Sequence, residues 1–460
     1  MVGLISPARG SFFGGAFAFF CSLLCSGNTL ANAAEVYGLG SDGISRAGAM
    51  TAAATGHESV FYNPAGVAFH QKQELSLGYL SDIPDLSIST GNGKATRDLT
   101  DPDLLLIGFT LPLGERLGVG FSAYLPVNPL TVTLVDARSP EDPHFSYFNR
   151  TQRLVIFSTA AVRPLKWLSL GLGLNILSGL QGTASSREGP THQLQPLVSQ
   201  ELVPRLAFNA GVRVEPLPRL ALGATYRQAF SVPFTVNSSH NVVGIPLEVL
   251  LQAEALQTPH ELALGAALRP VEALQLSLDT TWLFWSMENA PFIKLSADLG
   301  GGRITQQPPR QLYRDTFNIR LGAVLEQKAS DSIRVAYRLG HFFEPSYLED
   351  QPGRSNLLDG TKLGFCGGMG VTLQSEIYPQ PITFDVHFQA ISVLSRTYQK
   401  VISSVEEARI DPNALADEDG AVDGDQISNP GYPSISGSGM VYTVGATLTV
   451  EIEPVWKVLQ

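Results

Sequence analysis

The chain has 460 residues, of which 44% are hydrophobic and only 16% are charged, so a disordered chain is excluded. Its formal net charge of −11 repels a polyanion, which argues against nucleic-acid binding. The length suits either two or three soluble domains or one large β-barrel, and the order of segments along the chain decides between these.

Residues 1–33 have the features of a signal peptide. Arg9 is the only charged residue before Glu35, and it precedes an apolar run, residues 11–25, that is too short to span a membrane comfortably. Small residues at positions 31 and 33 predict cleavage before Ala34. Only one cysteine then remains, so no internal disulfide is expected.

Residues 34–72 are rich in Gly, Ala and Ser and lack a strand pattern. Gly38, Gly40 and Gly43 form a G-x-G-x-x-G match, but no strand precedes it to build a dinucleotide-binding unit. The glycines are better interpreted as tight turns. A compact segment ahead of a wide barrel predicts a plug in the lumen.

From residue 73 the chain repeats segments with a period of two. In residues 382–390 the apolar side chains Ile382, Phe384 and Val386 alternate with polar ones, which suits lipid on one face and water on the other. Tight turns alternate with long loops, as in outer-membrane barrels, whose short turns are periplasmic. Fourteen strands are predicted, near residues 73–82, 103–112, 116–127, 149–163, 167–178, 204–215, 219–232, 259–269, 273–287, 313–326, 331–343, 360–373, 381–395 and 438–452.

These patterns predict an all-β fold, a 14-stranded antiparallel transmembrane β-barrel over residues 73–452, plugged by the small segment 34–72. Residues 453–460 form a C-terminal extension, and no aromatic residue ends the last strand, so the assembly signal is in doubt. The alternative is a soluble β-sandwich or propeller, which does not ordinarily separate short and long connections in this way.

Two local features bear on function. Pro126 and Pro129, with Asn128 between them, remove ladder N–H groups from the third strand, producing either an ordinary strand end or a kink that opens the wall; the residues alone slightly favour the strand end. The run 246–256 predicts an apolar helix in an outer loop. Leu247, Leu250 and Leu251 on it either pack against a neighbouring loop or form a landing site for a hydrophobic ligand.

Motifs for chemistry are weak. The acidic run 417–425 does not match a calcium loop and is better interpreted as a solvated loop, and no zinc or serine-hydrolase motif occurs. No catalytic residue, metal or cofactor is therefore expected. A barrel can assemble catalytic side chains from different strands, so a hydrolase stays a minor alternative.

The early block 38–68, with Asn63, Pro64 and Ala65 at its centre, resembles the hatch domain and Asn-Pro-Ala motif of the FadL/TodX (OMPP1) family. Members are outer-membrane transporters of long-chain fatty acids and other hydrophobic compounds. The other matching ranges are 112–120, 170–175 and 314–322.

The resemblance implies passive transport, with capture by the outer loops, movement of the hatch and lateral exit through a kinked third strand. It therefore favours the kink at Pro126, Asn128 and Pro129. Arg314 matches a basic position that holds a fatty-acid carboxylate, and Arg187 lies near a second; alternatively, both are solvated loop-end residues.

The implied partners are a hydrophobic small molecule, outer-membrane lipid and the barrel assembly machinery. A monomer in the outer membrane of a Gram-negative bacterium is expected, without enzymatic activity. The alternatives are a general porin or structural barrel and, less favoured, a barrel hydrolase.

Overall fold

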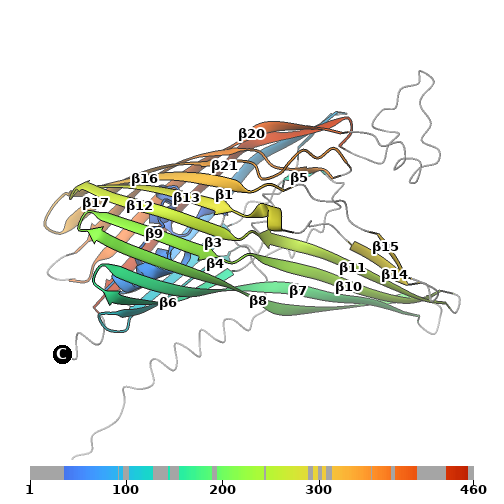
Figure 1. Ribbon diagram of the computed structural model, residues 1–460, viewed down its shortest axis with the longest axis horizontal. Helices are drawn as coiled ribbons and strands as arrows, with labels where there is room; N and C mark the ends of the chain where they lie inside the picture. The colour runs from blue at the N-terminus through green and yellow to red at the C-terminus, as the bar shows by residue number, and fades with distance from the viewer. Residues whose placement is uncertain are drawn as a thin grey trace, which may run out of the picture.

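The barrel is closed and antiparallel in the computed structural model (Figure 1). Its first strand pairs with both the last strand and the second barrel strand, so no edge is left open. The structure describes residues 36–91, 93–96, 103–127, 143–145, 155–188, 194–242, 245–288, 294–298, 303–306, 313–353, 355–374, 379–400 and 431–453.

Fourteen strands within these ranges form the wall, and neighbours in the chain are neighbours in space. The predicted strand number is confirmed, although several strands extend further outward than predicted. They are β1 (Gln73–Thr90), β3 (Asp103–Pro112), β4 (Leu117–Pro126), β6 (Val155–Leu165), β7 (Leu168–Glu188), β8 (Leu194–Leu217), β9 (Leu220–Arg227), β12 (Glu261–Val271), β13 (Leu274–Leu283), β16 (Thr316–Lys328), β17 (Ile333–Glu344), β19 (Lys362–Leu373), β20 (Ile382–Gln399) and β21 (Ser434–Ile452).

Further strands lie beyond the wall. A separate four-stranded sheet projects past one end of the barrel (Figure 1) and consists of β10 (Phe230–Val242), β11 (Ile245–Thr258), β14 (Lys294–Asp298) and β15 (Arg303–Gln306). Strand β2 (Gly93–Thr96) pairs with the end of β1, and β5 (His144–Phe145) pairs with β18 (Leu357–Leu358). A 3₁₀-helix, η2 (Trp285–Met287), follows β13.

The predicted helix over residues 246–256 is wrong, because these residues lie in β11. Leu247 is opposite His240 and Leu251 is opposite Val236 in the antiparallel pair with β10. A short apolar run fits both periods, and here pairing with β10 satisfies the backbone.

The alternation of inward and outward side chains follows the predicted division. Outward residues such as Leu172 and Leu339 are 70% and 69% exposed on the isolated chain, as lipid-facing residues must be. Inward residues include Arg213, Asp279 and Asp385, all of which are buried. The lumen therefore holds charges that need partners.

Some of those partners are on the wall, and others come from the N-terminal segment, residues 36–72, which lies inside the barrel (Figure 1). It contains two short α-helices, α3 (Ser41–Ser45) and α4 (Gly56–Tyr62), and a 3₁₀-helix, η1 (Pro64–Phe69). Gly38 and Gly40 have φ of 100° and 72°, a backbone conformation of turns that glycine adopts easily, whereas Gly43, also predicted to lie in a turn, lies in α3. No helix in the described ranges is both long and apolar enough to cross a membrane.

Candidate functional site

Asn63 joins three parts of the molecule. Its side-chain oxygen accepts the N–H of Ala65 at 3.0 Å and caps η1, in which Pro64 takes the first position. Its amide nitrogen donates to the carbonyl of Thr51 at 2.6 Å and to that of Val212 in β8 at 3.1 Å. One buried side chain thus fixes η1, the turn at residue 51 and the wall together.

Glycines allow this part of the segment to touch the wall directly. A Cβ atom at Gly171 would lie 2.3 Å from the carbonyl carbon of Pro64, and one at Gly211 would lie 2.1 Å from the side-chain oxygen of Asn63. Ser169 of β7 donates to the carbonyl of Ala65 at 2.8 Å. The inward glycines of β4, β7 and β8 that contact α4 and η1 are called here the glycine face: Gly118, Gly120, Gly171 and Gly211.

Charges hold the opposite side of the segment. Arg338 of β17 pairs with Asp42 of α3 through Nε at 2.7 Å and with Asp385 of β20 through its terminal nitrogen at 2.6 Å. Asp42 also pairs with Arg46. The Ser41 hydroxyl adds hydrogen bonds to Thr447 and His387 of the wall. The inward wall residues that hold α3 through these ion pairs and hydrogen bonds are called here the ionic face: Arg338, Asp385, His387 and Thr447.

Two buried titratable groups lie in α4, between these faces. Burial and the nearby Asp42 carboxylate raise the pKa of Glu58 to about 8, while its two oxygens accept the N–H groups of Asp42 and Gly43 at 3.1 and 2.9 Å. Burial alone would lower the pKa of His57, but its contact with the Glu74 carboxylate raises it overall. Near neutral pH Glu58 therefore favours its protonated form, and His57 keeps its proton to a higher pH than an ordinary histidine does.

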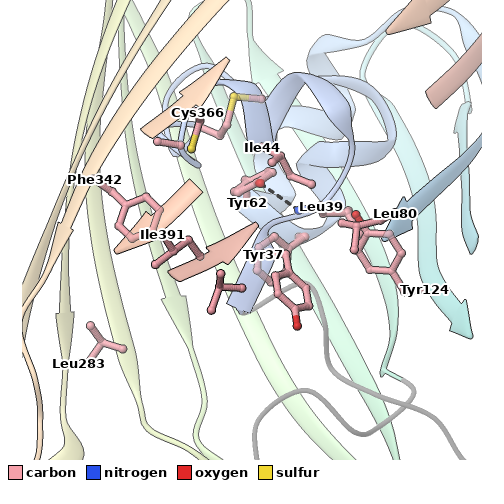
Figure 2. Close-up of a cluster of buried hydrophobic side chains, with 14 of the residues drawn as sticks. Tyr37, Leu39, Ile44, Tyr62, Leu80, Tyr124, Leu283, Phe342, Cys366 and Ile391 are labelled. Carbon is pink, nitrogen blue, oxygen red and sulfur yellow. Dashed lines mark hydrogen bonds between the residues drawn. The ribbon is translucent and has the colours of Figure 1, made fainter. Parts of the chain in front are cut away.

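An apolar cluster covers the outer side of the segment (Figure 2). Leu39 and Ile44 from the segment pack with wall residues that include Leu80 and Tyr124, and all four are at most 3% exposed. The backbone N–H of Leu39 donates to the Tyr62 hydroxyl at 2.9 Å, shown as a dashed line in Figure 2. The outer side of the segment is therefore apolar, although charged residues surround α3.

Cavities lie on both sides of the turn at residues 47–53. The outer one is about 80 Å³ and contacts Phe61, Tyr62 and Leu283 together with Arg227 and Arg320. The other, about 230 Å³, reaches the short turn between β8 and β9, which is at the periplasmic end. Both cavities are lined by residues of the same five wall strands, β9, β12, β13, β16 and β17.

The other predicted site residues are scattered. Pro126 is the last residue of β4, opposite Leu104 of β3, while Asn128 and Pro129 lie outside the described residues, so the kink stays a prediction. Arg314 is exposed and donates through Nε to the carbonyl of Ser346 at 3.0 Å, in a loop outside the barrel wall.

The remaining predicted residues belong to the outer extensions of the strands. Arg187 lies in β7 opposite Gln195 of β8. Leu247, Leu250 and Leu251 lie in β11 of the projecting sheet. The acidic run at 417–425 and the extension from residue 454 lie outside the described residues. Of the predicted site residues, the structure brings together Asn63, Pro64 and Ala65.

Sequence reasoning missed the ion pairs between α3 and the wall. Asp42, Arg46 and Glu58 are charged residues in a segment otherwise rich in small and apolar residues, and charges inside a plug require buried partners. That signal was readable, but the identity of each partner depends on how the segment is rotated in the lumen.

Three solved structures of other proteins have a similar fold over most of this chain. The structure of a FadL homologue of Pseudomonas aeruginosa matches with a TM-score of 0.55 at 15% identity, covering 90% of this chain and 97% of that one. The toluene transporters TbuX of Ralstonia pickettii and TodX of P. putida match with TM-scores of 0.52 and 0.53 at 16% and 13% identity, each covering 90% of this chain and 99% of the other. Identities this low show a common fold alone.

The sequence itself carries the assignment to a family. No curated protein sequence matches the chain. The model of the outer membrane protein transport protein family (OMPP1/FadL/TodX) matches residues 22–352, which is well over half of the chain. With its closed 14-stranded barrel, the chain is therefore an outer-membrane protein of a Gram-negative bacterium and belongs to the OMPP1/FadL/TodX transport family.

Proposed function

We propose that the protein is a passive channel for hydrophobic compounds, with long-chain fatty acids as the principal substrates. The observation that carries this proposal is the N-terminal segment, which lies across the lumen with an apolar cluster on its outer side and charged contacts below. The names of the related toluene transporters support hydrophobic cargo and add aromatic hydrocarbons as an alternative.

In the proposed pathway, the outer loops and the projecting sheet with Leu247 and Leu251 capture the substrate. The substrate then moves to the outer cavity beside Phe61 and Tyr62. Movement of the N-terminal segment, acting as a hatch, gives access to the wall, and the substrate leaves sideways near Pro126, Asn128 and Pro129. Lateral release keeps apolar surface away from water, whose contact costs about 25 cal/mol per Å².

The hatch role is tested by replacing Asn63 and Pro64 together with alanine. Loss of the three Asn63 hydrogen bonds should reduce uptake of a radiolabelled fatty acid by cells several-fold while the barrel still assembles, as judged by heat-modifiable electrophoretic mobility. Leu172→Ala, on the lipid-facing side, is the matched control. Unchanged uptake by the assembled double variant would contradict a gating role.

The substrate class is tested at Arg314. Arg314→Ala should weaken binding of a fatty acid more than binding of toluene, because only the acid presents a carboxylate. Equal effects on the two ligands would remove the proposed carboxylate role and favour hydrocarbons. Identification of lipids that copurify with the protein would check the same point without a mutation.

The alternatives predict different measurements. A general porin would give a large, steady conductance in planar bilayers, whereas a plugged channel should give little. A barrel hydrolase would convert lipid when pure, and that result would replace transport as the main activity.

A further inference from the structure

The periplasmic cavity is unusual because arginines dominate its lining. In a chain with a net charge of −11, the cavity contacts five arginines and three carboxylates, and Asp385 pairs with one of these arginines, Arg338, so a local excess of one positive charge remains. The arginines come from the N-terminal segment and from four wall strands or turns: Arg46, Arg213, Arg219, Arg269 and Arg338.

The carboxylates around the cavity neutralise only the deeper arginines. Asp42 pairs with Arg46 and Arg338, and Glu215 pairs with Arg213 at 2.8 Å. The third carboxylate, Glu326, makes no ion pair among the described contacts.

The two arginines at the rim are bonded to neutral oxygens in the described part of the chain. Arg219 donates to the carbonyl of Pro270 at 3.2 Å, and Arg269 donates to the side-chain oxygen of Gln275 at 3.3 and 3.4 Å. Their positive charge is therefore available to a ligand in the cavity.

Buried guanidinium groups below the rim also have unused donors. Arg46 is 4% exposed and Arg213 is 9% exposed, yet the Nε atom of each is buried without a hydrogen-bond partner among the described residues. Arg163 adds to the positive potential, since it and Arg213 both lie over the ring of Phe69, at 4.2 and 4.4 Å from its centroid. Several guanidinium groups with excess positive charge around one cavity are the features of an anion site.

We propose that this cavity binds a small oxyanion, a phosphate or carboxylate group that reaches it from the periplasmic side. Guanidinium groups match such oxygens with paired, charge-assisted hydrogen bonds. The site combines Arg46 of the N-terminal segment with Arg219 and Arg269 of the wall. A bound anion therefore stabilises the docked position of the segment, because the complete site exists only when the segment is in place.

The test uses the full chain purified in detergent and titrated with inorganic phosphate by calorimetry, with chloride holding the ionic strength constant. Arg219→Gln combined with Arg269→Gln should weaken phosphate binding at least tenfold. The matched control, Arg116→Gln with Lys166→Gln, removes two exposed periplasmic charges that do not line the cavity and should change binding less than twofold. Equal weakening by both pairs, or no binding to the wild type at millimolar phosphate, would overturn the proposal.

A second measurement needs no variant. Phosphate should raise the midpoint of thermal unfolding of the wild type above its value in chloride of equal ionic strength, and no difference would count against the site. Vesicles then identify the source of the anion. If phosphatidylglycerol in phosphatidylcholine vesicles competes with phosphate, the oxyanion is a lipid headgroup; if phosphate binding is unchanged, a soluble anion fills the same site.

Discussion

The glycine face and the ionic face hold the same short segment by different physical means. On the glycine face, the backbone of Pro64 and Ala65 rests directly on the backbone of the wall, so the fit depends on shape. On the ionic face, Arg338 lies between Asp42 and Asp385, so the fit depends on charge balance in a buried place. Shape tolerates no added atom, whereas charge balance can be altered by one proton or one lost partner. The ionic face is therefore the side from which a hatch would be released.

The largest expected effect comes from Arg338→Met. It leaves Asp42 and Asp385 facing each other without their shared cation, and removal of one member of a buried ion pair typically costs about 3–5 kcal/mol. We expect the docked segment to be destabilised and opening events in planar bilayers to become frequent. The exposed Arg334 on the same strand provides the control, Arg334→Met. A variant that stays as closed as the wild type would show that the glycine face alone holds the segment.

A smaller effect is expected on the other side from Gly171→Ala. The new methyl group would lie 2.3 Å from the carbonyl carbon of Pro64 and 2.4 Å from the nitrogen of Ala65, and neither backbone atom can move aside alone. Overpacking of this kind costs about 1–3 kcal/mol. Opening should increase in the same recordings, but less than in Arg338→Met.

Gly367→Ala is the matched control for this substitution. The nearest atom to its added methyl group is a flexible leucine carbon at 3.7 Å. If both alanines behave alike, the glycines of the wall are not selected for contact with the segment.

The pH dependence provides a further test, because α4 carries two buried groups, Glu58 and His57, whose pKa values are raised. The pKa of Glu58 is raised from 4.5 to about 8, so a released segment loses this proton more easily than a docked one. Docking therefore weakens as pH rises from 4.5 to 8. His57 acts in the same direction: its pKa is raised by Glu74 against the effect of burial, so its contribution is complete below pH 6.5 and lost above its raised value.

Opening in bilayers should accordingly increase several-fold between pH 5 and pH 8.5. Glu58→Gln removes the titration of Glu58 and should therefore flatten the profile, even if the amide changes opening by a constant amount at every pH. A wild-type profile that falls with pH would mean that charges on the wall dominate the response.

The sequence was sufficient for the wall and insufficient for the contents of the lumen. Period-two alternation such as Ile382, Phe384 and Val386 fixes which side chains face lipid, because lipid and water lie on opposite faces of each strand. The run around Leu247 predicts a helix, because a short apolar stretch fits both a helical and a strand period. In the structure this run pairs with β10 and is a strand.

Contacts inside the lumen depend on placement rather than pattern. Asp42 and Arg338 are almost 300 residues apart, and nothing local to either residue says that they meet. The sequence shows Gly171 as part of a glycine-rich strand. Why a glycine is needed there, namely that the backbone of Pro64 lies against it, can be seen only once the segment is folded. The Asn-Pro-Ala residues could be singled out from the sequence, whereas the hydrogen bonds of Asn63 to Thr51 and Val212 could not.

The smallest effect on opening is expected when one serine hydroxyl is removed from the side chains that hold each face. This pair of variants compares the glycine face and the ionic face most directly. Ser169→Ala removes one hydrogen bond to the carbonyl of Ala65 on the glycine side, which is worth about 1 kcal/mol. Ser41→Ala leaves both His387 and Thr447 without a buried partner on the ionic face, and unsatisfied buried groups cost about 1–3 kcal/mol each. Opening frequencies should therefore rank Ser41→Ala above Ser169→Ala, although both changes remove the same atom. The reverse order would mean that polar contacts matter more where the backbones touch, and that the glycine face, rather than the ionic face, controls release.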